Sequence, residues 1–170
     1  MPSAASGPSS KTFEIARLLP APRDAVWAAF TLLEQLKQWW GPVGLTMQSC
    51  TLDLRPGGLF HYGMAMPIGG TMWGRWVIRA VDAPERLEWL NAFSDPQGGL
   101  SRHPMAPTWP AEMLCTVAFE AKGDQTLLTL RSVPFEASAA EIATFEAGFA
   151  SMTQGFGGTF DQLASFLARK

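Results

Sequence analysis

The sequence contains few charged residues and few of the side chains that most often carry catalysis. Charged residues occupy 16% of its 170 positions, against ~25% in typical globular domains. The chain has only two histidines, two cysteines and one tyrosine. Thirteen basic and fifteen acidic residues leave a net charge of −2. This balance provides no electrostatic argument for binding nucleic acid or an anionic membrane, so we expect neither as a partner.

Long hydrophobic runs are also missing, although 47% of the residues are hydrophobic. No stretch approaches the roughly 18 consecutive apolar residues that indicate a membrane-spanning helix, so we do not expect a membrane protein. A chain of this length typically forms one domain with a substantial core. Residues 1–10 are Ser, Ala, Gly and Pro-rich without a hydrophobic segment, which predicts a disordered tail. Residues 11–170 are then the predicted single domain.

Motifs for catalysis and metal binding are absent from the sequence. Pro56-Gly57-Gly58 lacks the Lys and Ser or Thr that complete a phosphate-binding loop, and no Gly-x-Ser-x-Gly elbow occurs. The histidines, together with Cys50 and Cys115, do not have metal-ligand spacing. We therefore assign no catalytic residue, no metal and no cofactor. Two cysteines in strand-like segments are typical of a reducing compartment, which predicts a cytoplasmic protein.

The last fifth of the chain carries the clearest periodic pattern and predicts a single helix from Ser138 to Lys170. Ser138 and Glu141 have the spacing of a capping box. Gly155, Gly157 and Gly158 each cost ~1 kcal/mol relative to Ala inside a helix. We expect them to allow a bend, or close approach of a strand or of a second subunit in a homodimer. Apolar residues recur at steps of three and four along one stripe: Ile142, Phe145, Phe149, Met152, Phe156, Phe160, Leu163 and Leu167.

Upstream of this helix, a period of two predicts strands. A first strand, Thr12–Leu19, precedes a short helix containing Val26 and Phe30 and a second over Glu34–Trp40. The segment Ser94–Pro110 holds four prolines and two glycines and is predicted to be a long loop. Six more strands follow one another without helical crossovers and are therefore predicted to be antiparallel: Leu45–Leu54, Leu59–Met66, Thr71–Val81, Arg86–Phe93, Glu112–Ala121 and Gln125–Val133.

This order of elements predicts an α+β fold. A curved antiparallel sheet of about seven strands wraps around the long C-terminal helix, with two short helices between strands one and two. If side chains fill the space between sheet and helix, the result is an ordinary core. If the sheet stands away from the helix, a pocket opens between them.

Four short motifs follow one another along the chain: Trp39-Trp40-Gly41-Pro42, Asp53-Leu54-Arg55-Pro56-Gly57-Gly58-Leu59-Phe60, Pro84-Glu85-Arg86-Leu87, and Gly155-Phe156 followed by Phe160-Asp161-Gln162-Leu163. Together they resemble the family of heat-shock-protein-90 ATPase activators, part of the START-like, or SRPBCC, helix-grip superfamily. Phe156 stands where the family more usually has Trp. The resemblance covers nearly the whole chain from Lys11, and it implies a mostly hydrophobic cavity, a co-chaperone activity and a role in stress response.

The family register places Phe60 toward the cavity, and the alternation of side chains along strands extends this face. Methionines on such a face adapt to varied ligands. The alternative is that these residues simply form the core. The predicted ligand-binding residues are Tyr62, Met64, Met66, Met72, Trp76, Trp89, Asn91, Met113, Cys115, Phe145, Phe149, Met152 and Phe156.

Few polar residues accompany this apolar set. Asn91 and Tyr62 share the predicted inner face and either orient a polar group of a ligand or hydrogen-bond to the nearby backbone. His103 lies in the long loop and either gates the pocket or faces solvent. Glu112 begins a strand and is a candidate base only if it is buried.

Three functions are compatible with these observations. The first is binding of a small hydrophobic molecule between the sheet and the C-terminal helix. The second, implied by the family resemblance, is a protein-interaction module that binds a chaperone and stimulates its ATPase. The third is an enzyme acting on a hydrophobic substrate through Tyr62, Asn91, His103 or Glu112.

Overall fold

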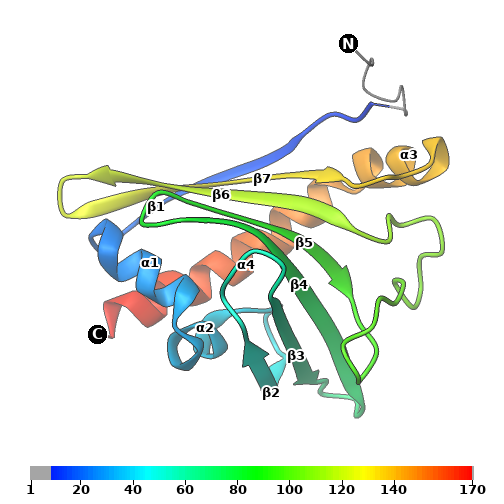
Figure 1. Cartoon of the computed structure of the whole chain (residues 1–170), viewed down its shortest axis with the longest axis horizontal. Coiled ribbons are helices and arrows are strands. Elements are labelled where there is room, and N and C mark those ends of the chain that lie inside the picture. The colour runs from blue at the N-terminus through cyan, green and yellow to red at the C-terminus, as the bar shows by residue number, and fades with distance from the viewer. Residues whose placement is uncertain (1–8, 170) are drawn as a thin grey trace.

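The computed structural model describes residues 9–169. Most of the predicted tail, residues 1–10, therefore lies outside the described part of the chain. From Lys11 onward the chain is tied to the fold, because the backbone N–H of Lys11 donates a 2.9 Å hydrogen bond to the Glu146 carboxylate. A single continuous sheet with four helices follows (Figure 1).

Seven antiparallel strands form the sheet in the order β1-β7-β6-β5-β4-β3-β2. Strands β2 to β7 are neighbours both in sequence and in space, and β1 pairs with β7 at the far edge. The predicted α+β fold and antiparallel sheet are confirmed. The strands are β1 Phe13–Leu19, β2 Thr46–Leu52, β3 Leu59–Ala65, β4 Thr71–Asp82, β5 Arg86–Phe93, β6 Met113–Lys122 and β7 Gln125–Pro134.

Glycines at the hairpin turns provide backbone conformations that other residues rarely adopt. Gly69 and Gly70 join β3 to β4 with φ of +94° and +87°, and Gly123 joins β6 to β7 with φ of +65°. Glycine takes positive φ without steric cost because it has no Cβ. These glycines therefore lie where the chain must reverse between neighbouring antiparallel strands.

Two short helices, α1 (Arg23–Thr31) and α2 (Leu33–Trp39), follow β1 as predicted. Phe30 of α1 is fully buried. Its ring contacts Trp39 at 4.7 Å and Phe119 of β6 at 5.1 Å between ring centroids. These edge-to-face contacts attach the helix pair to one end of the sheet.

The predicted C-terminal helix is two helices, so the prediction of a single helix is wrong. Helix α3 (Ala139–Ala147) ends at Gly148, and α4 (Phe149–Ala168) begins there and runs along the sheet (Figure 1). Gly148 has φ −92° and ψ 5°, outside helical geometry. Helix α4 continues through Gly155 and Gly157, so the interruption lies earlier than the predicted bend. The ring of Trp109 packs against Gly148, so the interruption coincides with a contact between segments distant in sequence.

Other features of the C-terminal region agree with the sequence. The capping box is present: the Ser138 hydroxyl accepts from the Glu141 N–H, and the Glu141 carboxylate accepts from the Ser138 N–H. Among the stripe residues, Phe149 and Phe156 are half-buried. The remaining six are buried: Ile142, Phe145, Met152, Phe160, Leu163 and Leu167.

Within residues 9–169, no helix is long and apolar enough to cross a membrane.

Candidate functional site

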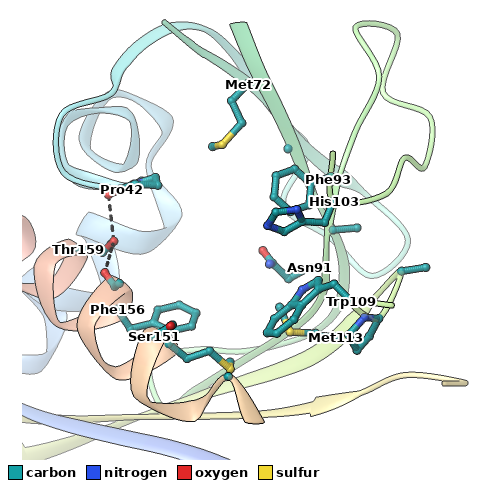
Figure 2. A pocket seen from close by; sticks show the side chains of 18 of the residues that line it. Pro42, Met72, Asn91, Phe93, His103, Trp109, Met113, Ser151, Phe156 and Thr159 are labelled. Carbon is teal, nitrogen blue, oxygen red and sulfur yellow. Dashed lines mark hydrogen bonds between the residues drawn. The ribbon is translucent and has the colours of Figure 1, made fainter. Parts of the chain in front are cut away.

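A cavity of about 710 Å³ lies between the sheet and the C-terminal helices. Four parts of the chain form its walls: the α2–β2 connection, strands β3 to β6, the segment between β5 and β6, and helices α3 and α4 (Figure 2). Exposed Pro42 and Ser151 mark its rim, whereas buried Met113 and Met152 line its interior. The volume falls within the range of small-molecule sites in proteins.

Six of the thirteen predicted ligand-binding residues line this cavity. They come from β3, β4, β5, β6 and α4, and alternation along the strands brings them to one face. Gly74 makes room for one of them, because a Cβ at that position would overlap the Tyr62 ring. The six are Tyr62, Met72, Asn91, Met113, Met152 and Phe156.

The other seven predicted residues lie outside the cavity wall, where most of them fill the core. Trp40 accounts for part of this difference, because its ring occupies the space that Trp76 and Trp89 were expected to face. The ring centroids of Trp40 and Trp76 lie 4.8 Å apart, and Trp76 stacks on Trp89 at 4.1 Å. Met64, Cys115 and Phe145 are likewise buried in the core, together with these two tryptophans.

The remaining two of these seven residues, Phe149 and Met66, lie outside the cavity wall for separate reasons. Phe149 packs its ring against Phe13 of β1 at 5.5 Å, which turns it toward the sheet edge and away from the cavity. Met66 lies just beyond the end of β3, in the turn before β4. Its backbone N–H donates to the carbonyl of Gly70 to close this turn.

Several lining residues were not predicted, because the alternation rule applies only to regular elements. Trp40 and Pro42 come from the connection after α2, and Trp109 and Pro110 come from the segment between β5 and β6. Two features of the sequence pointed to these regions, but neither predicted the direction in which the side chains point. One was the Trp39-Trp40-Gly41-Pro42 motif, and the other was the length of the Ser94–Pro110 segment.

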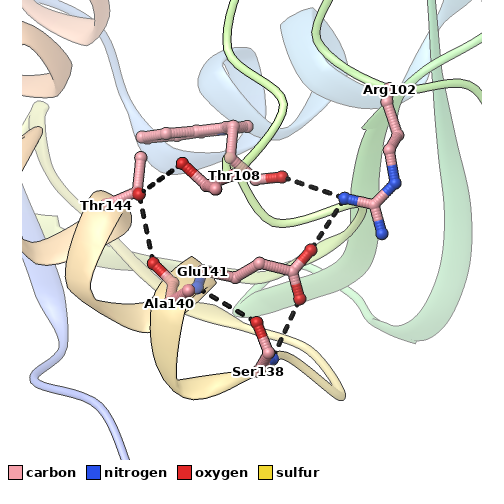
Figure 3. A network of polar contacts seen from close by, with 7 residues as sticks. Arg102, Thr108, Ser138, Ala140, Glu141 and Thr144 are labelled. Carbon is pink, nitrogen blue, oxygen red and sulfur yellow. Dashed lines mark hydrogen bonds and ion pairs between the residues drawn. The ribbon is translucent and has the colours of Figure 1, made fainter.

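The β5–β6 segment is held over the cavity by contacts with α3 (Figure 3). Arg102 forms a 2.7 Å ion pair with Glu141 and donates a 3.4 Å hydrogen bond to the carbonyl of Trp109. The hydroxyl groups of Thr108 and Thr144 form a 2.8 Å hydrogen bond. The predicted long loop is therefore an ordered wall of the pocket.

His103 also belongs to this wall and is half-buried there. Its ring packs edge-to-face on Phe93 at 5.0 Å, and its Nδ1 accepts a 3.0 Å hydrogen bond from the Met105 N–H. Accepting at Nδ1 leaves Nε2 as the protonated nitrogen of the neutral ring. His103 thus offers one remaining donor at the pocket (Figure 2).

Among the residues that the structure describes, no Asp, Glu, Lys or Arg lines the cavity. Glu112 instead forms an ion pair with Arg75, with N and O 3.6 Å apart. Arg75 alternates with the inward-facing Gly74 and Trp76, so this pair lies on the opposite face of the sheet. Glu112 is therefore not positioned as a base in the cavity.

Among residues 9–169, Oδ1 of the cavity residue Asn91 is buried without a hydrogen-bond partner. Tyr62 is also buried, and burial raises its pKa to about 12, although the neighbouring Trp40 indole, a hydrogen-bond donor, acts in the opposite direction. The Tyr62 phenol is consequently neutral at physiological pH. The hydrogen-bonding groups of this site are therefore uncharged.

The described residues contain no group of three or more His, Cys, Asp or Glu side chains placed to hold a metal ion. The chemistry available in the cavity is therefore apolar contact, aromatic packing and a few neutral hydrogen bonds.

Solved structures of several bacterial proteins are similar to this structure. A crystal structure of a protein from Nitrosomonas europaea has 26% sequence identity and a TM-score of 0.71, covering 93% of this chain and 94% of that one. A solution structure from Arthrobacter aurescens has 27% identity and a TM-score of 0.75, covering 94% and 87%. A crystal structure from Mycobacterium smegmatis has 26% identity and a TM-score of 0.72, covering 92% and 90%. A search of curated proteins found no match.

The sequence also matches one protein family over residues 20–168, a range that includes strands β2 to β7 and all four helices and begins directly after β1. The resemblance predicted from the four motifs is thereby confirmed. The chain belongs to the family of Activator of Hsp90 ATPase homolog 1-like proteins.

Proposed function

We propose that the protein binds a small, largely apolar molecule in the cavity between the sheet and α4. The observation that carries this proposal is the cavity of about 710 Å³, which persists although large aromatic side chains fill the adjacent core. Protein interiors are normally close-packed, so a cavity of this size in an apolar setting favours an occupant. Met72, Met113 and Met152 provide adaptable apolar contacts in its walls.

Native mass spectrometry of protein purified without detergent tests this proposal directly. We expect a retained molecule, and the same spectrum reports whether the chain forms a homodimer, one of the alternatives considered for its helix glycines. Binding of Nile red, an uncharged dye, provides a second measurement.

A matched pair of variants locates the binding. Ser151 is exposed at the cavity rim, and Thr153 is exposed on the same helix outside the cavity. Ser151→Trp should obstruct the cavity and weaken dye binding about tenfold or more, whereas Thr153→Trp should not. Equal binding by both variants would contradict the proposed site.

Membership in the family favours a second candidate, a module that binds a chaperone and stimulates its ATPase. This function would use the protein surface. The Ser151→Trp and Thr153→Trp variants should therefore stimulate the chaperone ATPase equally, although they differ in dye binding. Pull-down with the chaperone and an ATPase assay test it, and the absence of both effects would exclude it.

A further inference from the structure

Tyr62 is the single tyrosine of the chain, and it places a hydroxyl group in the largely apolar wall of the cavity. Its ring is held by aromatic neighbours, with ring centroids 4.9 Å from Phe60 and 6.4 Å from Trp40. The hydroxyl lies directly over Gly74, another residue of the cavity lining, where a Cβ would collide with it. Packing therefore fixes the position of this hydroxyl at the cavity wall.

The oxygen of the Tyr62 hydroxyl has a partner, but its proton does not. The Trp40 indole donates a hydrogen bond to the oxygen. Among residues 9–169 no group accepts the proton, and the hydroxyl, unlike Oδ1 of Asn91, is not fully enclosed by the protein. A donor without an acceptor is costly in an apolar setting, and phenylalanine would fill nearly the same space without that cost. Tyr62 therefore offers a donor to an acceptor inside the cavity.

Other polar side chains of the wall are already bonded or are donors as well. The Thr159 hydroxyl donates to the carbonyl of Gly41 at 2.9 Å, and the Thr144 hydroxyl donates to the carbonyl of Ala140 at 3.1 Å. His103 already accepts at Nδ1, which leaves its Nε2–H as a second donor (Figure 2). Inside the exposed rim, the unused groups of Tyr62 and His103 are thus both donors.

The lack of charge in the wall limits the occupant further. Within the described part of the chain no Asp, Glu, Lys or Arg lines the cavity, and Arg102 of the adjoining segment is paired with Glu141. An ionised ligand would leave water without a fixed charge to pair with, which is strongly unfavourable. A carbonyl oxygen accepts hydrogen bonds, is uncharged and adds no donor that would itself need an acceptor.

We propose that the cavity takes an uncharged, largely apolar molecule bearing a carbonyl group, a ketone or an ester, whose oxygen accepts a hydrogen bond from the Tyr62 hydroxyl. This inference rests on the proposed function, since it requires that the cavity binds a ligand. His103 is the alternative donor, and the experiment below distinguishes it from Tyr62.

Isothermal titration calorimetry at neutral pH, with the full chain titrated into each of three probes, tests the proposal. The probes share one ring system: 2-acetonaphthone carries a ketone, 2-isopropenylnaphthalene has a CH₂ group in place of the carbonyl oxygen, and 2-naphthoate carries a charge. The alkene is more hydrophobic than the ketone, so the quantity to compare is the ratio of the ketone affinity to the alkene affinity.

Partition of the two neutral probes from water into cyclohexane provides the reference for this ratio, because cyclohexane offers no hydrogen-bond donor. We expect the affinity ratio of the wild-type protein to exceed the ratio of the partition coefficients about tenfold. 2-Naphthoate should bind more weakly than the ketone.

Tyr62→Phe removes the donor and keeps the ring. It should lower the affinity ratio about tenfold and leave binding of the alkene within about twofold of wild type. His103→Leu removes the second donor for comparison. Thr116→Val is the matched control, because it also loses a hydroxyl, which hydrogen-bonds to Glu88 outside the cavity. This control should retain the wild-type ratio.

The outcomes separate the two proposals. Absence of binding by all three probes contradicts ligand binding in the cavity, and with it this inference. A wild-type affinity ratio equal to the partition ratio contradicts only carbonyl recognition, as does tighter binding of 2-naphthoate than of the ketone. An equal loss of both neutral probes in Tyr62→Phe would show that Tyr62 acts on packing alone, and a ratio that falls only in His103→Leu would assign the carbonyl to His103 instead. If Tyr62→Phe does not fold, the wild-type ratio decides.

Discussion

Trp109 lies so close to Gly148 that a Cβ at position 148 would come within 3.0 Å of its ring. This contact joins the segment between β5 and β6 to the interruption between α3 and α4. Trp109 also packs on Phe145, with ring centroids 5.9 Å apart. The residue that interrupts the C-terminal helix is therefore the residue that lets a cavity wall approach it.

Gly148, between α3 and α4, and the three glycines within α4 should respond differently to alanine. A Cβ at Gly155 or Gly157 would meet no atom within 4 Å, so Gly155→Ala and Gly157→Ala should each raise the free energy of unfolding by about 0.5–1 kcal/mol. Gly148→Ala and Gly158→Ala should not, because their Cβ atoms would meet Trp109 and Val43 at 3.0 and 2.9 Å. Urea unfolding measures all four variants. Equal stabilisation by all would show that these contacts do not constrain the helix.

Glu141 should make stability depend on pH. The Ser138 backbone N–H, and then the Arg102 side chain, hold the pKa of Glu141 below its usual value of 4.5. The folded pKa is lower than the unfolded one, so the stabilisation is present above about pH 4.5 and is lost as the pH falls through the folded pKa.

Glu141→Gln should accordingly lower the free energy of unfolding by up to about 1 kcal/mol at neutral pH, with a difference from wild type that shrinks in acid. Urea unfolding across this pH range measures the effect. Asp124→Asn, in the exposed turn between β6 and β7, is the control. A constant difference between wild type and Glu141→Gln at every pH would contradict the prediction.

The carbonyl of Gly41 accepts hydrogen bonds from two side chains of α4, Thr159 at 2.9 Å and Gln162 at 2.8 Å. Thr159→Val and Gln162→Leu should each cost about 1 kcal/mol of unfolding free energy. The double variant should cost more than the sum, because the carbonyl then loses both partners. A double-mutant cycle in urea measures this, and strict additivity would show that water replaces the lost donors.

The two cysteines should differ in reactivity. Burial raises the pKa of Cys115 to about 12, and it also raises the pKa of the half-buried Cys50 thiol. The thiolate is the reactive form, and Cys115 is also inaccessible. Iodoacetamide at mildly alkaline pH should therefore label native protein slowly and at Cys50 alone, as peptide mass spectrometry would show. The Cys50→Ser variant should remain unlabelled until it is unfolded; labelling of Cys115 in the native state would contradict its burial.

Strand positions and inner-face residues were predictable because they depend on local alternation. Tyr62, Asn91 and Met113 were placed on the inner face by alternation along the strands, after the family register had set Phe60 inward, and all three line the cavity. The same rule could not separate them from Trp76, Trp89 and Cys115, which share the face but lie in the core. The difference depends on the Trp40 ring. Trp40 lies in the connection after α2, where the alternation of side chains along strands does not apply.

The sequence by itself determined the order of the elements, the antiparallel sheet, the α3 capping box and the family. These follow from residue periodicity, turn chemistry and short motifs, all of which act between neighbours in the chain. Only the tertiary structure decided where the C-terminal helix is interrupted, which inner-face residues surround a cavity, and that the segment containing His103 and Trp109 forms one of its walls. Those features arise from contacts between residues distant in sequence, such as Arg102 with Glu141, whose pairing no local pattern specifies.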